Sequence, residues 1–150
     1  PQPTEAVPTE TPTMTATPAP APTPEAPSGT VIGSGSFDSS TGVGLNTHTA
    51  WTATEQADGS VKLTLSVYVR SYTLEIGQRS IAISVNGATS GGLTRSFSVD
   101  SPNSQTDTLI YTYSTTVQKG SAVSVSVDWN YKGQYSGRDL DVISSSSTVL

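Results

Sequence analysis

Cysteine is absent from this 150-residue sequence, and histidine occurs once, as His48. Without cysteine the chain has neither disulfides nor thiolate metal sites. With a single histidine, transition metals that prefer imidazole have almost no ligands. No apolar run is long enough to cross a bilayer as a helix. Stability must therefore come from packing, and the lack of cysteine is more typical of a bacterial or phage surface protein than of a small eukaryotic secreted domain.

Charged residues are also few, at 13% of the chain, and the formal net charge is -5. Glu5, Glu10 and Glu25 lie in the Pro-rich beginning, so the remainder carries nine acidic against seven basic residues, a net charge of about -2. The basic residues are scattered along the chain, unlike those of a nucleic-acid-binding surface. We therefore expect neither nucleic acid nor a membrane as a partner.

Residues 1–28 are rich in Pro, Thr and Ala, with only Val7 and Met14 as sizeable apolar side chains. Such a composition predicts a linker that is disordered or in polyproline II conformation. Its threonines next to prolines leave two interpretations open, an O-glycosylated stalk or an unmodified spacer. The chain begins at Pro1 without an initiator Met or a leader, so we expect it to be processed or cut from a longer protein.

Residues 29–150 are predicted to form one domain, because apolar side chains there alternate with polar ones and turn signals recur about every ten residues. Residues 61–70 show the alternation most clearly, and no segment has a helical period. Strands are expected over residues 30–37, 47–55, 61–70, 81–85, 93–99, 109–117, 123–131 and from 140 onward. Turns are expected at Asp58-Gly59, Asn86-Gly87, Lys119-Gly120 and Lys132-Gly133. About eight strands with one apolar face each predict an all-β, antiparallel two-sheet β-sandwich, immunoglobulin-like or jelly-roll-like.

The aromatic residues supply the candidate binding residues. Trp129 alternates in phase with valines and is expected in the core, as is Trp51, whereas Tyr68 is expected to point toward solvent. Sugars are bound by exposed flat rings beside hydrogen-bonding groups. The candidate glycan platform consists of Tyr68, Arg70, Tyr72, Tyr131 and Tyr135. In the alternative interpretation these tyrosines only cap strand ends.

Candidate catalytic groups are few. His48 is expected on the exposed face of an early strand, with no positioned nucleophile beside it. Glu55 and Glu75 are the only glutamates beyond the linker, and both are expected near turns rather than as the facing pair that glycoside hydrolysis requires. We therefore expect no catalytic residues and no enzyme activity.

Three aspartates are the candidate metal ligands. Asp139 and Asp141 lie two residues apart on an expected strand, and Asp128 lies on the preceding one. Oxygen ligands of this kind suit a structural calcium ion. The alternative is surface carboxylates that pair with Arg138 or Lys132. No other cofactor is expected.

Three segments, residues 67–79, 81–87 and 128–137, follow a pattern similar to the β-sandwich repeats of siphophage minor structural or tail-associated proteins. In those repeats a Tyr-Ser-Leu-x-x-Gly-x-Arg segment precedes a strand ending in Val-Asn/Asp-Gly, and a Trp-x-x-x-Gly-x-Tyr-Ser-Gly segment comes late. The likeness covers about residues 47–148, and the matching positions are Tyr72, Leu74, Gly77, Arg79, Trp129, Gly133, Tyr135 and Gly137. The resemblance implies that these residues specify the fold and carry no active site. The Gly/Ser-rich segment 88–95 departs from the pattern, and the Pro/Thr linker is typical of bacterial secreted multidomain proteins.

Two classes of function remain. The first is a non-catalytic extracellular module with a structural or adhesive role, in a surface appendage or a phage tail-like attachment, whose partners are neighbouring copies of the same assembly. The second is a carbohydrate-binding accessory module, tethered to a separate glycoside hydrolase or cell-wall enzyme, whose partner is a cell-surface or cell-wall polysaccharide. Both predict an extracellular location, at a cell surface or on a virion, and a bacterial or phage origin.

Overall fold

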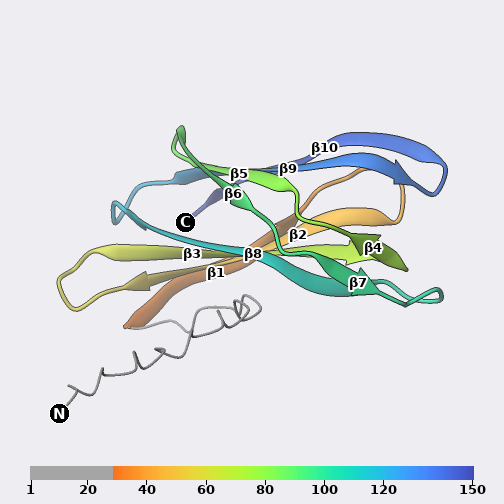
Figure 1. Cartoon of the computed structure of the whole chain (residues 1–150). Helices are drawn as coiled ribbons and strands as arrows, with labels where there is room; N and C mark the ends of the chain where they lie inside the picture. Colours follow the sequence, from red (N-terminus) through yellow and green to blue (C-terminus); the bar gives the residue numbers. More distant parts are fainter. Residues whose placement is uncertain (1–28) are drawn as a thin grey trace, which may run out of the picture.

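A computed structural model describes residues 29–150, which form a sandwich of two antiparallel sheets (Figure 1). The first sheet has the order β1 (Thr30–Asp38), β2 (Leu45–Glu55), β3 (Val61–Ser71), β8 (Thr106–Val117). The second has the order β10 (Arg138–Val149), β9 (Val123–Tyr135), β5 (Ser80–Val85), β6 (Ala88–Leu93). A short ribbon pairs β4 (Leu74–Ile76) with β7 (Phe97–Val99). The all-β, two-sheet prediction is confirmed, and the predicted linker lies outside the described residues.

The core lies between the two sheets and follows from the alternation in the sequence. On β3 every second side chain from Val61 to Val69 is fully buried, and on β9 Val125, Val127 and Trp129 are buried to the same degree. Burying an aliphatic side chain of this size contributes about 1.5–3 kcal/mol, so these two central strands supply much of the stability. Trp129 lies in the core as predicted, whereas Trp51 lies at its margin and is half-buried. In residues 29–150 the structure has no helix with the length and apolar character needed to cross a membrane.

The β5–β6 hairpin turns at Asn86-Gly87, as predicted. Both residues have positive φ, 50° and 82°, which matches the twist that two-residue hairpins favour. Asn86 Oδ1 also accepts a hydrogen bond from the Ser124 N–H at 2.9 Å, which ties the turn to β9.

The expected turn at Lys132-Gly133 is wrong. Gly133 pairs with Leu140 inside the β9–β10 ladder, and the chain turns at Ser136-Gly137, whose φ values are 50° and 74°. Lys132, at φ 47°, belongs to a bulge in which two residues of β9 lie opposite Asp141. Residues with positive φ occur both in bulges and in turns. The Lys132-Gly133 pair was therefore interpreted as a turn, although Lys132 belongs to a bulge.

The described residues contain ten strands where about eight were expected. The expected strand 93–99 is reduced to β7, and neither β6, which lies in the Gly/Ser-rich segment, nor the three-residue β4 was predicted. The register of β8 shifts between Val67 and Tyr68, so that Leu109 lies opposite Tyr68 while Ile110 is buried. Leu109 was expected on the same face as Tyr111, but a one-residue bulge moves a side chain to the other face of its sheet.

Candidate ligand-binding site

The five residues predicted as one glycan platform do not form one surface. Tyr131 and Tyr135 are only 4% and 7% exposed and belong to the core, so the expectation that they present their rings to solvent is wrong. The Tyr131 ring lies 5.4 Å from that of Trp129, and its hydroxyl donates to the Gln134 carbonyl at 2.7 Å. Burial raises the pKa of Tyr131 above its ordinary value of 10.0.

Tyr68 and Arg70 lie on the outer face of the first sheet. Tyr68 is flanked in register by His48 on β2 and by Leu109 on β8, and its ring centroid lies 6.1 Å from that of His48. His48 Nδ1 in turn lies 2.5 Å from an Asp38 carboxylate oxygen on β1. A row of four side chains therefore crosses the sheet at this level.

Arg70 is held in place by carboxylates. Its Nε and Nη2 donate to the two carboxylate oxygens of Asp107 at 2.8 and 3.0 Å, and Nη1 lies 3.9 Å from Asp38. The hydrogen bond to Asp107 raises the pKa of Arg70, so this guanidinium stays charged. Asp107 takes two of the five N–H donors of Arg70, which fixes the guanidinium, and three N–H groups remain for another acceptor.

Tyr72 lies elsewhere, at the end of the sandwich where β3 finishes, and is 39% exposed. Its backbone N–H donates to the Tyr135 hydroxyl at 3.1 Å. Gly44 lies against the Tyr72 ring, where a Cβ would come within 2.8 Å of Cε2. The Tyr72 ring therefore packs against the backbone at Gly44 although it is exposed.

The Tyr72 hollow, with a volume of about 550 Å³, is lined by Tyr72 together with Glu75, Pro102, Gln134 and Tyr135. Its polar residues include Glu75, whose carboxylate accepts hydrogen bonds, and Gln134, whose side-chain amide both donates and accepts. An exposed ring, a carboxylate and an amide in one hollow match what a sugar offers, an apolar face with hydroxyls around its edge.

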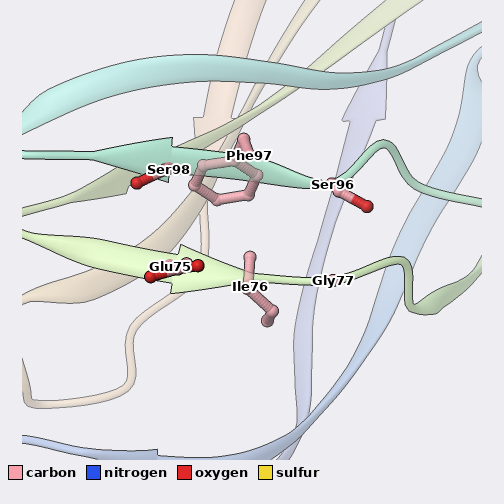
Figure 2. Close-up of a pocket in the computed structure, with 6 residues that line it drawn as sticks. All are labelled: Glu75, Ile76, Gly77, Ser96, Phe97 and Ser98. Atoms are coloured by element: carbon pink, nitrogen blue, oxygen red, sulfur yellow. The ribbon is translucent and has the colours of Figure 1, made fainter.

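A neighbouring hollow of about 580 Å³ follows the β4–β7 ribbon (Figure 2). Glu75 on β4 lies directly opposite Ser98 on β7, and the next pair, Ile76 and Phe97, is buried. Glu75 lines both hollows, so the two hollows adjoin at this residue. A polymer that occupied the Tyr72 hollow would therefore continue into the hollow along the β4–β7 ribbon.

Sequence reasoning missed Glu75 and Gln134 as binding residues. Glu75 was expected near a turn, but it is the exposed middle residue of β4, between the buried Leu74 and Ile76. That apolar-polar-apolar pattern in the sequence is the signal that could have identified it. Gln134 carries no comparable signal, because its place follows from the bulge and turn of the β9–β10 hairpin.

The three aspartates predicted to hold calcium are not brought together. Asp128 pairs with Ser144, Asp139 pairs with Gln134, and Asp141 lies in the bulge between them. Among residues 29–150 no three His, Cys, Asp or Glu side chains are grouped closely enough to hold a metal ion. The bulge at Asp141 breaks the regular alternation on which the prediction depended.

Comparison with known proteins gives no match, whether with family models, curated proteins or solved structures. The likeness to siphophage repeats thus stays a prediction from sequence motifs. The function has to be inferred from the residues of the site.

Proposed function

We propose that this chain is a non-catalytic extracellular attachment module that holds a polysaccharide in the Tyr72 hollow. The observation that supports this proposal is the combination found there, an exposed tyrosine ring that packs against Gly44, beside Glu75 and Gln134. The module works by adhesion: it binds a glycan surface and changes no bond in it. A catalytic domain or a surface appendage joined to it would be held near that glycan.

One such hollow supports weak binding. A single ring and a few exposed hydrogen bonds correspond to a dissociation constant of about 1 mM, because open sites exchange solvent hydrogen bonds for ligand hydrogen bonds with a small net gain. Attachment to a polysaccharide tolerates this weakness, since repeated sugar units and several modules raise the overall avidity by about 10²–10⁴.

The test is affinity electrophoresis of the whole chain in gels containing soluble β-1,4-glucan, xylan, mannan or glycol chitin. We expect retardation by at least one of these polysaccharides. Tyr72→Ala should weaken it about tenfold, the effect of losing about 1.4 kcal/mol of binding free energy. Tyr68→Ala is the matched control, because it removes the same side chain from the outer face of the first sheet, and it should change binding less than twofold.

Two results would contradict the proposal. If no polysaccharide retards the chain, attachment to these glycans fails. If Tyr68→Ala abolishes binding and Tyr72→Ala does not, the site lies on the outer face of the first sheet instead.

A purely structural role is the second candidate, and the first sheet offers an observation in its favour. Strand β1 is an edge strand with no charged residue before Asp38, and Val31 and Ile32 are 48% and 40% exposed. Uncharged exposed edges of this kind pair with further strands. Sedimentation velocity and electron micrographs of the concentrated chain test this: oligomers that Val31→Lys disperses support assembly through β1, and a monomer at all concentrations contradicts it.

A further inference from the structure

A third hollow lies at the opposite end of the sandwich from the two described above. Strands β2 and β3 pair from Leu45–Ser71 at the Tyr72 end to Glu55–Val61 at the other. At that far end a hollow of about 540 Å³, here called the Trp51 hollow, opens between the two sheets. Its walls include Trp51, Val61 and Leu150, and its rim includes Glu55, Lys119 and Ser121.

Glycines fix the position of the indole. A Cβ at Gly35 would lie 2.9 Å from Trp51 Nε1, and one at Gly33 would lie 3.2 Å from Cζ3. Glycine inside a strand weakens the strand, and it is expected where a bulky group approaches the backbone closely. The two glycines of β1 therefore make room for the half-buried Trp51 at the wall of the hollow.

The rim carries opposite charges. Lys119 Nζ donates to a Glu55 carboxylate oxygen at 2.8 Å, and the two side chains are 59% and 31% exposed. An exposed pair of this kind contributes little stability and exchanges readily with solvent. It thus presents a donor and an acceptor to a ligand, with the Ser121 hydroxyl beside them.

We propose that the Trp51 hollow is a second saccharide site, which takes a neutral hexopyranose unit. The indole and aliphatic wall suits the apolar face of the sugar ring, and the Glu55–Lys119 pair suits its hydroxyls. An acyl chain fits less well, because it has no hydroxyls to exchange hydrogen bonds with the Glu55–Lys119 pair at the rim. The proposal depends on different residues from those of the Tyr72 hollow and does not need that site to bind.

Two sites on one module have a geometric consequence. Trp51 and Glu55 lie six and ten residues along β2 from Leu45, so at about 3.3 Å per residue the two hollows are separated by about 20–33 Å along the strand. One module would then hold a long polysaccharide at two places or join two chains. Thr30, the first residue of β1, pairs with Glu55, so the Trp51 hollow lies beside the beginning of β1. The Tyr72 hollow lies at the opposite end of the sandwich.

Tryptophan fluorescence gives a direct test, because the chain has two tryptophans and Trp129 is 0% exposed. Quenching by acrylamide therefore reports mainly on Trp51. The probes are hexasaccharides of β-1,4-linked glucose, N-acetylglucosamine and mannose, at up to about 10 mM, tenfold above a dissociation constant of about 1 mM. They are applied to the whole chain and to Tyr72→Ala, which leaves the Trp51 hollow intact.

We expect at least one probe to lower the quenching constant about twofold, equally in both proteins. Ser121→Phe, which fills the mouth of the hollow from an exposed position, should abolish this protection, and Lys119→Met should weaken it at least threefold. Urea unfolding shows whether each variant is folded. If Ser121→Phe is unfolded, the result with Lys119→Met decides whether the rim of the hollow binds the saccharide.

Absence of protection by all three probes would overturn the proposal, as would protection that survives both rim substitutions. Failure of the Tyr72 site would be seen in a different experiment, as electrophoretic retardation that Tyr72→Ala leaves unchanged. That result would not alter the protection of Trp51 from acrylamide, so the two sites can fail independently.

Discussion

The two glycines of β1 lead to a stability prediction that is specific to one contact. Gly35 has an ordinary strand conformation, so alanine fits the backbone there. Its Cβ, however, would lie 2.9 Å from Trp51 Nε1 and 3.1 Å from both Cε2 and Cζ2. These atoms belong to a rigid ring packed at the margin of the core, which cannot move aside like the end of a flexible side chain.

The magnitude follows from two opposing terms. Alanine in place of a strand glycine gains about 0.5–1 kcal/mol, because the unfolded chain loses conformational freedom. Overpacking against a well-packed ring is unfavourable by about 1–3 kcal/mol. Gly35→Ala should therefore lower the free energy of unfolding by about 1–2 kcal/mol. With an m-value of about 2 kcal/mol/M in urea, the midpoint should fall by about 0.5–1 M.

Urea unfolding measured by circular dichroism checks this value. Gly91→Ala is the matched control, because Gly91 is also a strand glycine and a Cβ there meets only the Ile81 carbonyl oxygen, at 3.6 Å. The control should be neutral or more stable than the wild type by up to about 1 kcal/mol. In a Trp51→Leu background Gly35→Ala should, like the control, be neutral or stabilising by up to about 1 kcal/mol, because the contact with the indole is gone. A Gly35→Ala protein as stable as the wild type, or a loss that persists without Trp51, would refute the reasoning.

Three further predictions concern single residues. Asn86→Ala should lower the free energy of unfolding by about 1–2 kcal/mol, because alanine is strained at φ 50° and Ser124 N–H loses its acceptor; an unchanged urea midpoint would contradict this. Burial raises the pKa of Tyr131, so its contribution to stability is complete below pH 10 and is lost as the pH rises through the folded pKa. Alkaline unfolding of the wild type and Tyr131→Phe checks this, and the same pH dependence in both proteins would disprove it. Tyr135→Phe leaves Tyr72 N–H without its acceptor and should lower stability by about 1 kcal/mol and weaken saccharide binding; calorimetry that finds neither change would exclude that role.

The regular parts of the fold could be predicted because burial and alternation coincide. Strand β3 alternates without interruption, and its pairing with β2 has no bulge, so the predicted faces agree with the structure. Errors occur where the ladder is irregular. The bulges at Lys132 and Ile110 each change the parity of the residues that follow, and no local residue preference in the sequence distinguishes them from turns or regular strand.

The candidate site was predicted only in part, for a similar reason. Tyr72 was identified as an accessible ring, and it is exposed. Its partners in the hollow come from β4 and from the end of β9, so their proximity depends on tertiary packing rather than on spacing in the sequence. Tyr131 and Tyr135 were expected at or near strand ends with accessible rings, but β9 continues through Lys132 to Tyr135 and both side chains belong to the core.

The most direct test of the central claim is to observe which residues a saccharide contacts. Backbone amide NMR spectra of the ¹⁵N-labelled chain, recorded during titration with the β-1,4-linked hexasaccharides, give this at single-residue resolution. The account predicts that the largest shifts from the attachment site occur at residues 72–75 and 134–136, and that in Tyr72→Ala about tenfold more saccharide is needed to produce them. Shifts centred on Tyr68 and His48, or no shift near Tyr72 with any of the probes, would contradict it.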